Sequence, residues 1–122
     1  RETIVVGIWN TARRVIEYAP QKAFDLENRK NIKNSPLSAA RPAESDEYLR
    51  FIVTELKPFI DKNYSTKPNR AETFIMGSSM GALMSLYAIS EYPNVFGGAG
   101  CVSTHFPLGG GVMLGYMRKF LP

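Results

Sequence analysis

The sequence is poor in the residues on which several common protein activities depend. It has one cysteine, Cys101, one histidine, His105, and one tryptophan, Trp9, in 122 residues. One cysteine excludes an internal disulfide, and no group of cysteines and histidines has the spacing of a metal site. No apolar run reaches the roughly 18 residues that a membrane-spanning helix needs. We therefore expect no metal, no cofactor and no membrane span.

The charge is mildly basic but does not gather in one place. The formal net charge is +4, and acidic residues interrupt the lysines and arginines even in the most basic stretch, residues 22–33. Nucleic-acid binding needs a basic stripe or patch, so we expect no nucleic-acid partner. Apolar residues make up 44% of the chain and charged residues 21%, which is ordinary for one globular domain over residues 1–122.

The first half of the chain predicts a strand, a long excursion and a helix. Residues Thr3–Ile8 are apolar and β-branched without alternation, which predicts a strand buried on both faces. Residues 10–42 have no sustained period, and we expect a long loop with one short helix near Ala23. Ser45 is the expected N-cap of an amphipathic helix that ends near Asn63 and bends at Pro58.

The second half predicts two more strand–helix pairs. We expect a strand at Thr73–Met76, a buried helix at Ala82–Tyr92, a strand at Gly97–Ser103 and a last helix at Val112–Phe120. The resulting order, β-α-β-α-β-α, is typical of an α/β fold with a parallel sheet and right-handed crossovers. The chain starts with Arg, and no leader segment follows, so it looks cut at the front and indicates no localisation.

One short stretch carries the chemistry. Residues 77–81 read Gly-Ser-Ser-Met-Gly, which has the form G-x-S-x-G between a predicted strand and a predicted helix. In a nucleophile elbow the turn is so tight that both glycines are expected to lack room for a side chain. The central residue, Ser79, is then the nucleophile, and the backbone N–H of Met80 is an oxyanion donor. The plainer alternative is a turn of small residues that lets a strand and a helix pack closely.

The likeness to a known family extends well beyond this motif. The stretches "TIVVGIWNTARRVIEYAP", "LRFIVTELKPFIDKNYSTKPNRAETFIMGSSMGALMSLYAISEYPNVFGG" and "STHFPLG" resemble the putative-esterase branch of the α/β-hydrolases, which includes esterase D-like, feruloyl and enterochelin esterases. The resemblance implies the central parallel-sheet portion of an α/β-hydrolase fold, incomplete at both ends. It also implies hydrolysis of a small-molecule carboxylic ester through an acyl-enzyme on Ser79. Acyl transfer by the same fold, or a non-catalytic fragment that only binds, are the alternatives.

A serine nucleophile needs a histidine base and an acid. In this fold both come after the serine along the chain, first the acid and then the histidine. His105 comes soon after Ser79, and Glu91, on the helix after the motif, is the sole carboxylate between them. The resemblance therefore implies an acid and a base beyond Pro122, and a second oxyanion donor before Arg1.

Three further residues are candidates for contact with substrate. His105 follows the third predicted strand and could line the substrate pocket, or be a surface histidine. Trp9 and Asn10 end the first predicted strand at the edge where such sites form. They could line the cleft, or Trp9 could pack on the long loop while Asn10 starts a turn.

Overall fold

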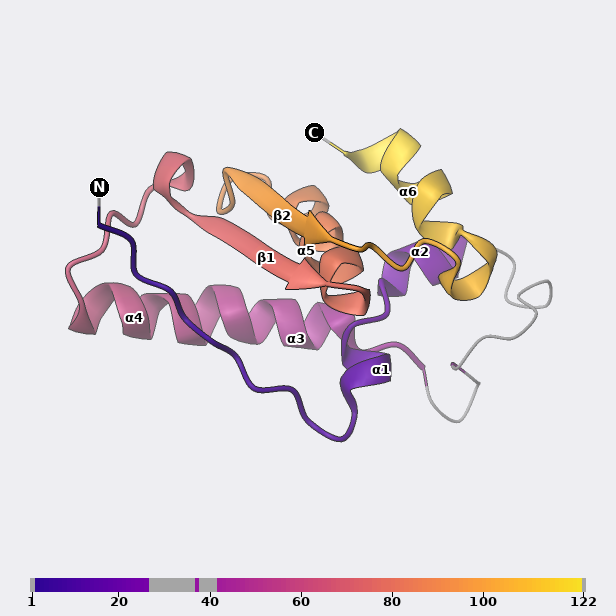
Figure 1. Ribbon diagram of the computed structural model, residues 1–122, viewed down its shortest axis with the longest axis horizontal. Coiled ribbons are helices and arrows are strands. Elements are labelled where there is room, and N and C mark those ends of the chain that lie inside the picture. The colour runs from indigo at the N-terminus through magenta and orange to yellow at the C-terminus, as the bar shows by residue number, and fades with distance from the viewer. Residues whose placement is uncertain (1, 27–36, 38–41, 122) are drawn as a thin grey trace.

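A computed structural model describes residues 2–26, 37 and 42–121 of the chain (Figure 1). Its centre is a parallel pair of strands, β1 (Phe74–Ser78) and β2 (Gly98–Val102), joined by helix α5 (Met80–Glu91). Phe74 is paired with Gly98 and Ser78 with Val102. These elements confirm the second strand, the second helix and the third strand that the sequence predicts, with bounds shifted by one or two residues.

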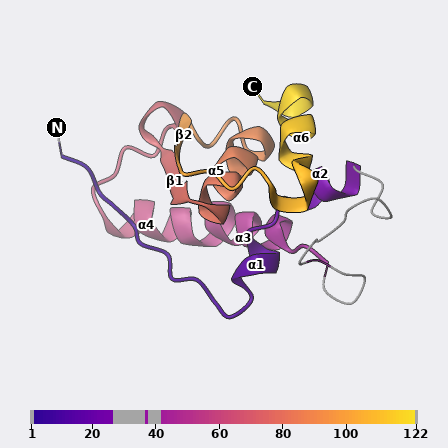
Figure 2. The same ribbon diagram turned by 45° about the vertical axis from the view of Figure 1, so that its right-hand side comes forward.

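The other helices pack on one side of this unit. They are α1 (Arg14–Glu17), α2 (Gln21–Leu26), α3 (Ser45–Phe51), α4 (Lys57–Asn63) and α6 (Val112–Phe120), with 3₁₀ turns at Arg70–Glu72 and Leu108–Gly110. Helix α2 contains Ala23, where a short helix is predicted, and α6 has the predicted bounds. Although α2 and α6 are far apart in sequence, they lie side by side in both views (Figures 1 and 2). The rest of the predicted excursion, residues 27–36 and 38–41, falls outside the described residues.

Helices α3 and α4 form one long rod, as the apolar spacing predicts, but its details differ. A π-helical segment, Ile52–Leu56, joins them, and Pro58 lies in the first turn of α4. Because proline has no N–H to give to the preceding turn, the regular pattern changes there. The predicted N-cap is wrong: Glu44 is the N-cap, and Ser45 is the first helical residue. Ser45 is buried, and its Oγ accepts the Gln21 N–H at 2.8 Å, tying α3 to α2.

The buried strand predicted at Thr3–Ile8 is not formed. Residues 3–8 run extended without strand pairing and are exposed, Val5 to 87%. In the described part of the chain the sheet consists of β1 and β2 alone, and a strand needs a paired neighbour to form a ladder. The β-branched composition therefore gives an extended backbone here, but neither pairing nor burial.

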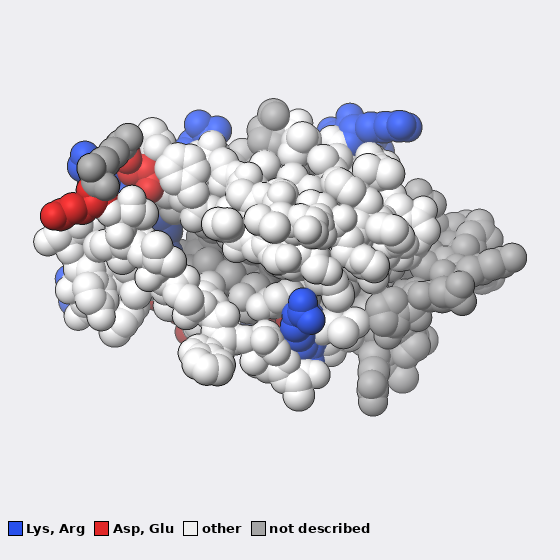
Figure 3. Space-filling model, viewed as in Figure 1, with Lys and Arg blue, Asp and Glu red and all other residues white. Residues whose placement is uncertain are grey.

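The core lies between α5 and the helices α2, α3 and α6. Leu83 and Tyr87 of α5, Leu49 of α3, Phe24 of α2 and Tyr116 of α6 are all buried in it. The other face of the sheet is open: Phe74 is 65% exposed and Met76 75% exposed. Few charged side chains cover this side of the molecule (Figure 3). The arrangement is a β-α-β unit with helices packed on one face, which is compatible with part of an α/β fold.

Candidate active site

Ser79 stands at the junction between β1 and α5, where the chain reverses direction. Its backbone has φ 57° and ψ −115°, and a positive φ is uncommon for any residue but glycine. The strain persists because both backbone groups of Ser79 are held. The Ser79 N–H donates to the Val102 carbonyl at 2.9 Å, and the Ser79 carbonyl accepts the Ala82 N–H at 3.2 Å.

The two glycines of the motif do not have equal roles. A Cβ built on Gly77 would lie 2.4 Å from the backbone carbon and oxygen of Gly81, so position 77 has no room for a side chain. A Cβ built on Gly81 would meet nothing within 4 Å. The expectation that both positions exclude a side chain is therefore wrong for Gly81. The turn brings the Gly81 backbone over position 77, whereas its own Cβ would point into open space.

Met80 is the first residue of α5, and its backbone N–H faces the start of the helix. The first N–H groups of a helix have no partner within it, and no backbone acceptor for this one is found among the described residues. The positive end of the helix dipole adds to its attraction for negative charge. An oxygen anion formed beside Ser79 would meet this donor without displacing another hydrogen bond.

The segment after β2 folds over the elbow. Ser103 has φ 46°, so the two non-glycine residues with positive φ in the described part, Ser79 and Ser103, follow adjacent parallel strands. The His105 N–H then donates to the Ser79 carbonyl at 3.3 Å. Sequence analysis did not single out Ser103, because nothing in the residue type marks the strained turn.

The His105 side chain is exposed beside the elbow. Within the described residues its imidazole makes no hydrogen bond or ion pair, either to Ser79 Oγ or to any carboxylate. The tertiary structure thus brings the His105 backbone to Ser79 and leaves its ring at the surface.

Glu91 is the carboxylate between Ser79 and His105 in sequence. It makes its contacts at the end of α5 that is far from Ser79. It accepts hydrogen bonds from Lys22 Nζ of α2 and from Tyr116 Oη of α6. The hydrogen bond and ion pair with Glu91 raise the pKa of Lys22, and burial, followed by the bond to Glu91, raises the pKa of Tyr116. Glu91 therefore joins three helices and does not approach His105.

Trp9 and Asn10 lie in the extended segment before α1. Trp9 is 94% exposed. Most of the long loop on which it could pack lies outside the described residues, so both alternatives for Trp9 stay predictions. Asn10 is exposed and its Nδ2 donates to the Thr11 carbonyl at 3.2 Å. The described residues show no hydrogen bond from either one to the elbow. In the same part of the chain there is no cluster of three or more metal-ligating side chains, and no helix long and apolar enough to cross a membrane.

Comparison with known proteins gives a family and two relatives. A family model described as "Putative esterase" matches residues 11–115. YbbA of Bacillus subtilis (strain 168), an uncharacterized protein, is 28% identical over 102 residues, which are 84% of this chain and 37% of YbbA. YjcH, an uncharacterized protein of the same organism, is 36% identical over 88 residues, 70% of this chain and 32% of YjcH. This chain therefore spans about a third of these relatives' length. No solved structure matches it significantly.

Proposed function

This chain belongs to the putative esterase family, and on that basis we propose that it hydrolyses a small-molecule carboxylic ester through an acyl-enzyme on Ser79. The observation that carries the proposal is the strained backbone of Ser79 between a strand and a helix. Strained backbones cluster at functional sites, where the surrounding structure holds them in place. A turn that served packing alone would not need a non-glycine residue at φ 57°.

The proposed reaction has two steps. Ser79 Oγ attacks the ester carbonyl carbon while a base removes the Oγ proton, and the Met80 N–H donates to the oxyanion that forms. The carbon–oxygen bond to the alcohol then breaks, the alcohol leaves with a proton, and Ser79 carries the acyl group. Water attacks this ester in the second step, which releases the acid and restores the Ser79 hydroxyl.

The base and acid are proposed to be a histidine and a carboxylate of the full-length protein that lie outside residues 1–122. Glu91 is engaged by Lys22 and Tyr116, and the His105 ring lacks a carboxylate partner among the described residues. We assign His105 to the wall of the substrate site, since its backbone N–H contacts the Ser79 carbonyl. Trp9 and Asn10 are assigned to the outer part of that site on the sequence argument alone.

Hydrolysis of p-nitrophenyl acetate by the full-length protein tests the nucleophile. Ser79→Ala should lower kcat/KM at least about 10³-fold, since one serine belongs to the catalytic unit. The matched control is Ser78→Ala, which changes the adjacent exposed serine and should keep most of the activity. Equal losses in both variants, or full activity in Ser79→Ala, would assign the chemistry to another residue.

A fluorophosphonate label separates an enzyme from a fragment that only binds, because it modifies activated serines. We expect labelling of the full-length protein at Ser79 and none in Ser79→Ala. Added alcohols separate hydrolysis from acyl transfer. If they consume the acyl-enzyme in place of water and give a new ester as the main product, the protein is an acyltransferase.

A further inference from the structure

The Ser79 carbonyl and the proposed oxyanion donor belong to the same peptide group. The bond between Ser79 and Met80 is trans, so its C=O and its N–H point in opposite directions and turn together as one rigid plane. Any contact that fixes the direction of the Ser79 carbonyl therefore also fixes the direction of the Met80 N–H. The donors to this carbonyl decide where the oxyanion donor points.

Three N–H groups donate to the Ser79 carbonyl. Those of Ala82 and Leu83, at 3.2 and 3.3 Å, belong to the first turn of α5, and a helix that begins here supplies them by itself. The third, from His105 at 3.3 Å, comes from the segment after β2. Because it comes from outside the helix, this donor restrains the peptide plane from a second direction.

The end of β2 brings this third donor to the elbow. The Val102 carbonyl accepts the Ser79 N–H at 2.9 Å, so the last residue of β2 lies beside the elbow. The next residue, Ser103, has φ 46° and turns the chain, and the N–H of His105 then reaches the Ser79 carbonyl. One short segment thus holds both backbone groups of Ser79.

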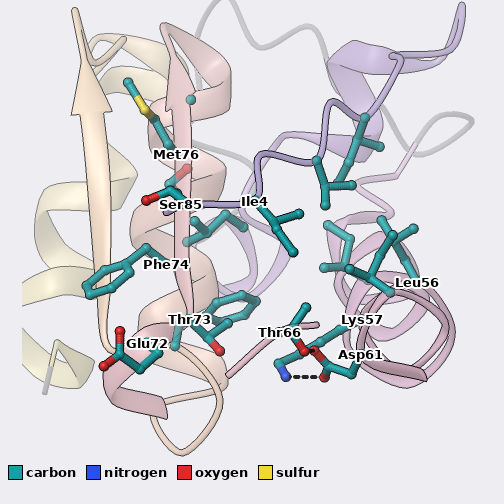
Figure 4. A pocket seen from close by; sticks show the side chains of 18 of the residues that line it. Ile4, Leu56, Lys57, Asp61, Thr66, Glu72, Thr73, Phe74, Met76 and Ser85 are labelled. Carbon is teal, nitrogen blue, oxygen red and sulfur yellow. Dashed lines mark hydrogen bonds and ion pairs between the residues drawn. The ribbon is translucent and has the colours of Figure 1, made fainter. Parts of the chain in front are cut away.

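The segment after β2 restrains the elbow from one side and leaves the other side free. A groove of about 910 Å³ lies beside β1, and Figure 4 shows Ile4 pointing into it. Ser78 and Gly81, on either side of the elbow peptide, line this groove, whereas the described residues 102–111 contribute nothing to its lining. The contact with the Ser79 carbonyl is therefore made without filling the space beside β1.

The turn that carries His105 is also held at its far side. The His105 carbonyl accepts the Leu108 N–H at 3.2 Å, and Leu108 is buried in the core. The next residue, Gly109, lies against the ring of Phe24 in α2, where a Cβ would lie 2.6 Å from a ring carbon. The backbone of His105 is thus fixed between Ser79 and the helices, as a positioning group needs to be.

We propose that His105 is a positioning residue for ester hydrolysis and acts through its backbone N–H. By binding the Ser79 carbonyl it holds the shared peptide plane, so that the Met80 N–H points at the oxyanion before the reaction starts. The same hydrogen bond polarises the peptide group, which makes the Met80 N–H a stronger donor. This inference rests on the proposed function, and it assigns the role to the N–H and not to the imidazole.

The test compares His105→Pro with His105→Ala in the full-length protein. Both variants lose the imidazole, but only proline also removes the N–H. The Phe106 N–H donates to the Thr104 carbonyl at 2.9 Å, which makes His105 the centre of a γ-turn. Its φ is not positive, so this is the inverse γ-turn, with φ about −75°. Proline, with φ about −65°, fits this conformation.

We expect the loss of the N–H to act on kcat. With p-nitrophenyl acetate, kcat should be at least about tenfold lower in His105→Pro than in His105→Ala, since a misdirected oxyanion donor loses much of its effect. KM should be similar in the two variants. Trifluoroacetone, which matches the acetyl group and forms an oxyanion on a reactive serine, should inhibit His105→Pro more weakly by a similar factor.

Equal kcat in the two variants overturns the inference while Ser79 remains the nucleophile. Absence of Ser79-dependent hydrolysis in the unmodified protein overturns the proposed function, and the inference with it. If circular dichroism shows that His105→Pro is unfolded, Ser103 decides. Ser103 is exposed, and valine at φ 46° is strained, so Ser103→Val should open the turn and lower kcat at least about tenfold. Ser103→Gly adopts this φ freely and should retain kcat. Equal kcat in these two variants also overturns the inference.

Discussion

A Cβ atom on Gly77 would lie 2.4 Å from the carbonyl oxygen of Gly81, whereas a Cβ on Gly81 would touch nothing within 4 Å. Gly77→Ala should therefore lower the free energy of unfolding by about 3 kcal/mol or more, because backbone cannot move aside as a side chain does. Gly81→Ala is the matched control and should be neutral or stabilising by up to about 1 kcal/mol, as alanine is favoured in helices. Urea denaturation of the two variants measures the difference, and similar losses in both would contradict it.

Relief of backbone strain should separate stability from activity at Ser79. Ser79→Gly should raise the free energy of unfolding by roughly 1 kcal/mol, because glycine adopts φ 57° without steric cost. It should also remove the proposed esterase activity along with the hydroxyl. Ser103→Gly, at φ 46°, should stabilise similarly and keep activity. The control is Ser90→Gly at a position within α5, which should lower the free energy of unfolding by about 1 kcal/mol. A loss of thermal stability in Ser79→Gly would show that the turn is not strained.

The His105 imidazole should be dispensable for the proton transfers. If His105 only lines the site, His105→Ala should change KM for p-nitrophenyl acetate more than kcat in the full-length protein, and the pH profile of kcat should keep its shape. A loss of kcat as large as that of Ser79→Ala would instead make His105 the base. The 122-residue chain by itself should show little Ser79-dependent turnover, since among the described residues no imidazole–carboxylate pair reaches the elbow.

The helices around Glu91 should come apart at alkaline pH. Burial, and then its hydrogen bond to Glu91, raises the pKa of Tyr116 above the ordinary value near 10. The folded pKa lies above the unfolded one, so this contribution to stability is fully present below about pH 10 and is lost as pH rises toward the folded pKa. Lys22 acts in the same direction, because its hydrogen bond to Glu91 raises its pKa.

Denaturation as a function of pH from 7 to 12 measures this loss. Tyr116→Phe should lower the free energy of unfolding by about 1–3 kcal/mol at pH 7, because the hydrogen bond to the Glu91 carboxylate is lost. It should also make the decline in stability above pH 10 shallower. Tyr64→Phe, at an exposed tyrosine, should change neither. An unchanged alkaline decline in Tyr116→Phe would show that another group is responsible. Tyr87 is the first to test, since burial and its bond to Asp46 raise its pKa too.

The local patterns of the sequence determined most of the secondary structure. Apolar spacing is sufficient to predict the helical rod from Ser45 to Asn63, helix α5 and helix α6. Small and β-branched runs likewise predict β1 and β2, and alternation with helices predicts their parallel pairing. These features depend on residues within a few turns of each other, which is the range over which periodicity and capping act.

The candidate site was only partly determined in this way. The motif Gly77–Gly81 predicts where the chain turns between strand and helix, because the tight turn requires a residue without a side chain at position 77, close in sequence to the turn itself. It does not reveal that Gly81 has room for a side chain, that Ser103 shares the strained conformation, or that Glu91 is held by Lys22 and Tyr116. Each of these depends on segments distant in sequence.

The tertiary structure decided pairing and burial. Residues Thr3–Ile8 have the composition of a buried strand, yet they stay extended and exposed, because a strand is completed by a neighbour and not by its own residues. Ser45 has the residue type of an N-cap, but its hydroxyl binds the Gln21 N–H, since folding places α2 against α3. Sequence thus determined the conformations open to each segment, and long-range contacts decided which hydrogen bonds and which faces were used.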